Sequence, residues 1–164
     1  PILQHPTDDD YYLTHNEFDR ESIWGAYFVP SEWNVSNVDD MYRVTVIFGH
    51  SNGNSMHKKF SVLKYFRDVN FAKEHRYIYL TLGEQQTRWK IFAVADYPID
   101  PSYTIANPDD SYFLTEIASM KAYSYNQYAT EVGLNDKVLI LSTCSGSDNY
   151  DTRFIVCAKL DEVF

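Results

Sequence analysis

Short apolar stretches recur along the chain and are separated by polar segments rich in Gly, Asn, Asp and Pro. In 42–48, Val44, Val46 and Phe48 occupy every second position, the period that is typical of a β-strand. The short connection 83–87 contains a glycine between two such stretches and predicts a hairpin. The pattern predicts six strands, at 23–29, 42–48, 76–82, 88–95, 137–143 and 153–160.

Two other segments carry apolar residues near helical spacing, at 57–75 and 108–126. Asp109 or Asp110 is a candidate N-cap for the second helix, which lies in the long connection 96–136. The apolar residues are Phe60, Leu63, Phe66 and Phe71 in the first segment and Phe113, Ile117 and Met120 in the second.

The length of 164 residues is sufficient for one domain with a real core, and we expect a single domain over 1–164. Many strands, short turns and few helices favour a mostly antiparallel barrel or sandwich decorated by helices. A composition of 45% hydrophobic and 16% aromatic residues agrees with a folded, strand-rich chain.

The formal net charge of −9 argues against a nucleic-acid partner, because phosphate backbones bind basic surfaces. The longest apolar runs, 137–141 and 91–95, are far too short to cross a bilayer. The chain opens with Pro1 and shows no signal peptide, so it says little about a membrane anchor.

Cys144 ends a predicted strand and opens a polar loop, where a thiol is half-exposed. Arg153 begins the next strand, and a hairpin-like return brings it back beside Cys144. A guanidinium there favours the thiolate and can hold a developing oxyanion. The alternatives are a buried cysteine that fills the core and a solvent-facing arginine at a strand end.

The second cysteine, Cys157, lies four residues further along the last strand than Arg153. That offset is roughly 13 Å, so Cys157 cannot bond to a Cys144 that is level with Arg153. We interpret Cys157 as a core residue.

Among five histidines, His50 alone ends a strand as Cys144 does, after Gly49 and before a turn. His5, His15, His57 and His75 have the context of surface residues. Two residues at strand ends can meet at one rim of a sheet, which is the geometry that a shared site requires. A metal site at His50 and His57 fits no standard ligand spacing, and we expect no metal and no cofactor.

The ordered set Gly49-His50, Leu141-Ser142-Thr143-Cys144 and Arg153-Phe154 resembles the sortases, the cysteine transpeptidases of Gram-positive bacteria. The serine in the tetrapeptide, the helix from Asp110 to Asn126 and the N-terminal segment 8–16 resemble class B.

The resemblance implies an eight-stranded sortase-type β-barrel with one or more N-terminal helices and a long helix between the family's sixth and seventh strands. The two strands beyond the six in the pattern are expected in 31–38 and 97–104.

The resemblance also implies catalytic roles for His50, Cys144 and Arg153. Cys144 would cleave a C-terminal sorting signal after Thr, and a thioacyl-enzyme would pass the protein to an amine of peptidoglycan or of its lipid-linked precursor. His50 would act as the acid and base, and Arg153 would hold the oxyanion. Candidate substrate-binding residues are Ser142, Thr143, Ser145, Tyr103, Thr104 and Ile105.

The resemblance further implies the extracytoplasmic face of the cell membrane, with an anchor that would precede Pro1. An alternative within the family is a class B pilin polymerase that uses a lysine amine as acceptor. A papain-like protease would need cysteine before histidine and on a helix, which this order does not offer. A non-catalytic β-barrel that binds sugars through its tyrosines stays open, and it predicts no thiol-dependent activity.

Overall fold

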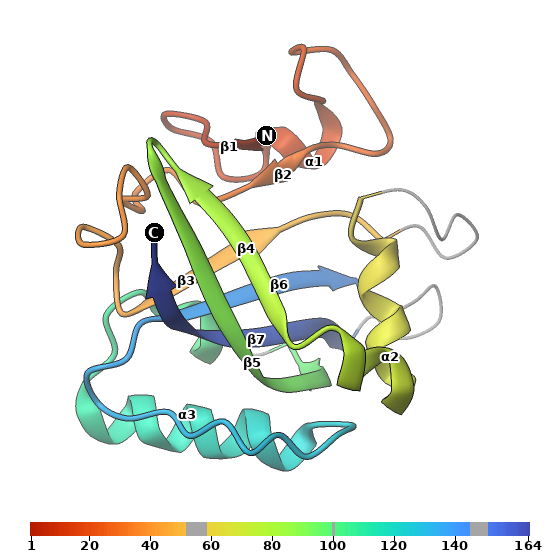
Figure 1. The fold of residues 1–164 in the computed structure, drawn as a ribbon. Helices are drawn as coiled ribbons and strands as arrows, with labels where there is room; N and C mark the ends of the chain where they lie inside the picture. Colours follow the sequence, from red (N-terminus) through yellow and green to blue (C-terminus); the bar gives the residue numbers. More distant parts are fainter. Residues whose placement is uncertain (52–58, 100, 145–150) are drawn as a thin grey trace.

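The computed structural model describes residues 1–51, 59–99, 101–144 and 151–164, and it describes only the backbone of Pro101, Ser102 and Cys144. The described residues form one seven-stranded sheet in the order β1-β2-β3-β6-β7-β5-β4 (Figure 1). The strands are β1 Ile2–Leu3, β2 Tyr27–Phe28, β3 Val44–Phe48, β4 Tyr77–Leu82, β5 Gln85–Pro98, β6 Val138–Cys144 and β7 Thr152–Val163. The helices are α1 Tyr11–Thr14, η1 Lys59–Arg67, α2 Val69–Glu74, η2 Pro101–Thr104 and α3 Asp110–Tyr123, where η marks a 3-10 helix.

The curved sheet is buried on both faces. Leu139 and Leu141 of β6 contribute to one core cluster, which also receives side chains from η1 and α2. Val138 and Ile140 of the same strand point to the other cluster, which α3 covers. Burial on two sides explains why the central strands are continuous apolar runs rather than alternating ones.

The arrangement agrees with the mostly-β prediction, but seven strands are found in the described residues instead of eight. Segment 31–38 forms turns and irregular backbone, because the side-chain oxygens of Asn34 and Asn37 accept from the backbone N–H groups of Ser36 and Asp40. Tyr97 and Pro98 end β5, and η2 follows from Pro101, so 97–104 adds no separate strand. A proline cannot donate to a strand ladder, which accounts for the break.

The predicted strand 23–29 is reduced to the two residues of β2, whereas β5 and β7 extend beyond their predicted bounds. The hairpin of β4 and β5 turns at Gly83, whose φ of +58° suits a glycine in a tight turn. The strand β1 pairs with β2 in parallel and was not foreseen.

The predicted helix 57–75 is divided into η1 and α2 within its described part. Asp68 interrupts it, because its Oδ1 accepts from the N–H groups of Asn70 and Phe71 at 2.8 and 2.9 Å and so caps α2. The second predicted helix is confirmed as α3, with Asp109 as its N-cap. Phe113, Ile117 and Met120 are buried as the pattern predicts. No helix among the described residues is both long and apolar enough to span a bilayer.

Candidate active site

The edge of the sheet where β3 and β6 end brings together segments that are distant in sequence. The two strands are parallel, and Phe48 pairs with Ser142 in a register offset of 94 residues (142 minus 48). The N–H of Gly49 donates to the carbonyl of Ser142 at 3.1 Å, which continues the contact past the strand end. At the same offset His50 is level with Cys144, so both strand exits lie at one rim.

The return strand β7 completes this rim. In the antiparallel pairing of β6 with β7, Cys144 lies directly opposite Arg153. The sequence therefore predicts correctly that Arg153 is level with Cys144. Pairing on both sides of β6 places the backbone of three sequence-predicted residues, His50, Cys144 and Arg153, at a common edge.

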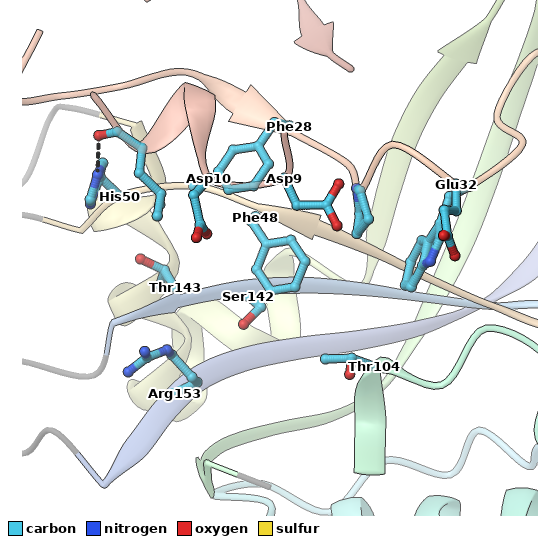
Figure 2. A pocket seen from close by; sticks show the side chains of 14 residues that line it. Asp9, Asp10, Phe28, Glu32, Phe48, His50, Thr104, Ser142, Thr143 and Arg153 are labelled. Atoms are coloured by element: carbon cyan, nitrogen blue, oxygen red, sulfur yellow. Dashed lines mark hydrogen bonds between the residues drawn. The ribbon is translucent and has the colours of Figure 1, made fainter. Parts of the chain in front are cut away.

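A cavity of about 460 Å³ opens at this edge. Its size is within the usual range of ligand pockets. Five of the sequence-predicted residues line the cavity, namely His50, Thr104, Ser142, Thr143 and Arg153. Figure 2 shows Asp9 and Asp10 extending from the N-terminal segment on one side of the pocket and Arg153 from β7 on the other.

The imidazole of His50 is half-buried and held by the N-terminal segment. Its Nε2 lies 2.7 Å from the carbonyl oxygen of Leu13 in α1, the contact drawn in Figure 2. A carbonyl can only accept, so Nε2 carries the proton in this contact. In the neutral ring Nδ1 is then the unprotonated nitrogen, free to act as a base.

Gly25 allows α1 to approach the imidazole this closely. Its φ is +51°, and a Cβ at this position would lie 2.2 Å from the carbonyl oxygen of Tyr12, 3.0 Å from that of Leu13 and 3.1 Å from Cδ2 of His50. The N–H of Ala26 also donates to the Tyr12 carbonyl at 2.9 Å. The position of the histidine thus depends on a backbone path that only glycine fits.

The guanidinium of Arg153 is partly buried at the cavity wall. Its one described hydrogen bond is a weak contact of 3.4 Å from Nη1 to the carbonyl of Thr152. No ion pair joins Arg153 to a carboxylate in the described ranges. Its N–H donors are therefore available for an anionic or carbonyl oxygen in the cavity.

The two residues before Cys144 differ in their bonding. The buried Oγ of Ser142 lies 3.1 Å from the hydroxyl of Tyr103, so η2 is tied to β6. The buried Oγ1 of Thr143 has no partner within the described residues. A buried hydroxyl without a partner is unusual in proteins, and Thr143 lines the cavity.

The remaining predicted residues lie elsewhere. Tyr103 is buried in the core behind the cavity, and Ile105 is 44% exposed and lines a small crevice beside α3 instead. Ser145 and His57 lie outside the described residues. Cys157 is buried, as predicted, and burial raises the pKa of its thiol well above the ordinary value.

The sequence did not indicate the acidic and aromatic part of the cavity wall. These residues come from the N-terminal segment, from the stretch after β2 and from the end of β3: Asp9, Asp10, Glu32, Phe28, Trp33 and Phe48. Asp9 fixes this region, since its Oδ1 accepts from the N–H of Ser31 at 2.6 Å. Such a contact spans 22 residues and leaves no periodic signal in the sequence.

No family model matches the chain. Sortase B of Listeria monocytogenes serovar 1/2a is 27% identical over 162 residues, which cover 98% of this chain and 63% of the relative. The solved structure of sortase B from Listeria monocytogenes superimposes with a TM-score of 0.81 at 26% identity and covers 98% of this chain and 86% of that one. A Staphylococcus aureus sortase B–substrate complex has a TM-score of 0.84 at 20% identity, over 99% of this chain and 73% of that one.

The chain therefore spans less than two thirds of the curated relative that it matches. Over 98% of its length the chain resembles sortase B of Listeria monocytogenes in both sequence and fold. The resemblance in the sequence is confirmed: the chain is a relative of the class B sortases.

Proposed function

We propose that this chain is a sortase-type cysteine transpeptidase that acts on a C-terminal sorting signal and uses Cys144, His50 and Arg153. The observation that carries the proposal is the register of β6 with both neighbours, which brings these residues to one edge at a cavity of about 460 Å³. A Staphylococcus aureus sortase B of the same fold has been solved with a substrate, which supports a peptide ligand.

In the first half of the proposed reaction, Nδ1 of His50 takes the proton of the Cys144 thiol, and the resulting thiolate attacks the carbonyl carbon of the threonine in the sorting signal. Arg153 and nearby backbone N–H groups stabilise the oxyanion that forms. The C–N bond then breaks, and His50 gives a proton to the departing amine. The products are a thioester on Cys144 and the free C-terminal fragment.

In the second half, an incoming amine attacks the thioester while His50 takes up its proton. The new amide forms, and the thiolate of Cys144 leaves. Because Nε2 of His50 is bonded to the Leu13 carbonyl, Nδ1 is the nitrogen that exchanges the proton in both halves. The arginine also favours the thiolate before attack, since a neighbouring cation lowers the pKa of a thiol.

The acceptor in this proposal is an amine of peptidoglycan or of its lipid-linked precursor. An incoming amine is cationic in solution, and Asp9, Asp10 and Glu32 at the cavity would raise its local concentration. Such an acceptor would place the protein at the extracytoplasmic face of the cell membrane.

The test is mass spectrometry of the protein mixed with a library of threonine-containing sorting-signal peptides. We expect a mass increase on Cys144 that equals the acyl fragment, and release of that fragment when an amine is added. The Cys144→Ala variant should form no adduct and cleave no peptide. The matched control, Cys157→Ala, should retain both steps. Cleavage by Cys144→Ala at the rate of the parent protein contradicts the mechanism.

The same reaction supplied with two amines identifies the acceptor. A short peptidoglycan peptide and a protein lysine compete for the thioester, and the joined product is read by mass. Joining to the peptidoglycan amine supports wall attachment, and joining to lysine alone would assign the chain to pilus assembly.

A further inference from the structure

A second cavity, of about 270 Å³, shares no lining residue with the one beside His50. It lies between α2, the residues that follow α2, strand β5 and the segment 126–130 after α3. The charged side chains among its lining residues are Lys73, Arg76 and Lys90, and all three are cations. No carboxylate belongs to the lining that the structure describes.

The backbone keeps these cations close together. The N–H of Ile91 donates to the carbonyl of Arg76 at 2.9 Å, which places Arg76 beside Lys90 at the edge of β5. Nε of Arg76 donates to the carbonyl of Lys73 at 3.1 Å, so the guanidinium lies against the end of α2. Strand pairing and the end of α2 therefore place the three residues side by side at the cavity.

This cluster contrasts with six other described cations of an acidic chain that has 23 acidic and 14 basic residues. Ion pairs with carboxylates are formed by Arg43, Lys59, Arg67, Arg88, Lys121 and Lys159. Within the described ranges, Lys73, Arg76 and Lys90 form no such pair.

The neighbour of Lys90 across the sheet, Lys159, is paired with a carboxylate and adds no net charge to the cavity. Lys159 of β7 pairs with Lys90, and its Nζ is neutralised by Asp136 at 3.1 Å. The three cations of the lining, Lys73, Arg76 and Lys90, have like charges and repel one another, and a bound anion would reduce that repulsion.

We propose that this second cavity binds a phosphate group. Two ammonium groups and a guanidinium offer many N–H donors, which suits a ligand with three or four oxygens and up to two charges better than a carboxylate with two oxygens and one charge. A volume of about 270 Å³ accommodates a phosphate with a short substituent and not a large cofactor. This site is independent of the function proposed for the first cavity.

The test is a titration with inorganic phosphate at constant ionic strength, with sodium chloride as the balancing salt. We expect saturable binding by calorimetry with a Kd on the order of 1 mM, as for a solvated cluster of charges. At ten times that Kd the midpoint of thermal unfolding should rise by about 3–6 °C. An equal rise of the unfolding midpoint with sodium chloride alone would show a general salt effect and would overturn the proposal.

Dimethyl phosphate, a monoanionic diester, distinguishes the two sources of the same group. Binding at least about tenfold weaker than that of inorganic phosphate assigns the site to a terminal phosphate. Equal binding assigns it to a bridging phosphodiester. Binding of neither probe contradicts the assignment.

Variants locate the site. Lys73→Gln, Arg76→Gln and Lys90→Gln should each raise the Kd roughly three- to fivefold, since each removes one exposed charge contact. Arg20→Gln is the matched control, because Arg20 is exposed, does not line the cavity and has no described ion pair. If Arg20→Gln weakens binding as much as the other three, the effect is one of net charge and the site does not exist.

Discussion

The two cysteines lie on neighbouring strands and differ mainly in where along the strand each one falls. Cys157 is in the middle of β7, opposite Ile140 and Ala93, and has no exposed surface. Cys144 is the last residue of β6, opposite Arg153 and beside the cavity that His50 lines. The residue type is the same, so its position in the ladder decides whether a cysteine lies in the core or at a strand end beside a cavity.

The largest effect expected from this difference is in alkylation. Iodoacetamide should modify Cys144 in the folded protein at least about 10³-fold faster than Cys157, whose thiol is buried and has a raised pKa. Peptide mass mapping over a time course measures both rates. Unfolding in guanidinium chloride is the control and should bring the two rates together. Comparable alkylation rates of Cys144 and Cys157 in the folded protein would show that the two thiols do not differ in accessibility.

The second test removes the cation that is level with Cys144. Arg153→Ala should lower kcat/KM for the sorting-signal peptide by about 10²–10³-fold, because the oxyanion loses a charged donor. Arg153→Lys should recover only part of the loss, since an ammonium lacks the forked geometry. The matched control is Arg88→Ala, which removes a cation of β5 that pairs with Asp161. A change in Arg153→Ala no larger than in Arg88→Ala would mean that Arg153 is an ordinary strand-end residue.

The third test concerns the backbone contact that positions the imidazole of His50. Gly25→Ala should lower stability by about 2–4 kcal/mol and reduce kcat, because its Cβ overlaps the Tyr12 carbonyl and displaces α1 from His50. Gly83→Ala is the control, because Gly83 also has a positive φ, of +58°, but its added Cβ would lie 3.3 Å from the nearest atom, the carbonyl oxygen of Ser36. We expect Gly83→Ala to lower the free energy of unfolding by about 1 kcal/mol and to leave kcat unchanged. Calorimetric unfolding and peptide kinetics on both variants measure the difference. Equal kcat values in Gly25→Ala and Gly83→Ala would show that turnover does not depend on the contact between Leu13 and His50.

The smallest effect is expected at the buried thiol. Cys157→Ala removes a fully buried sulfur and should reduce the free energy of unfolding by about 1–2 kcal/mol through the space it leaves. Denaturant titration measures this loss. A loss of peptide turnover at a temperature where the variant is fully folded would contradict the assignment of Cys157 to the core.

Much of the central sheet could be predicted because its signal is local. Apolar runs show the strands that become β3 to β7, and a short loop between two of them brings Arg153 level with Cys144. Gly49 and the turn after His50 indicate a strand exit, although the parallel pairing of β3 with β6 could be expected only from the resemblance.

The other features of the fold and of the cavity depend on contacts that leave no local pattern in the sequence. In 23–29 only Tyr27 and Phe28 pair with neighbouring strands, so β2 is short. The division between η1 and α2 follows from one capping side chain, Asp68. The acidic wall of the cavity arises where the N-terminal segment folds over the sheet edge. Tyr103 and Ile105 lie next to Thr104 in sequence, but the turn of η2 directs only Thr104 to the cavity.

The hydrogen bond that orients His50 is provided by a main-chain oxygen. Replacing the side chain of Leu13 leaves that oxygen in place, so an alanine scan would not detect that Leu13 sets the tautomer of His50. The dependence of His50 on this oxygen can be detected only by changing the backbone, either by replacing Gly25 or by removing roughly the first two dozen residues. A fragment designed around the strands β3 to β7 alone would keep Cys144 and lose the contact that orients His50.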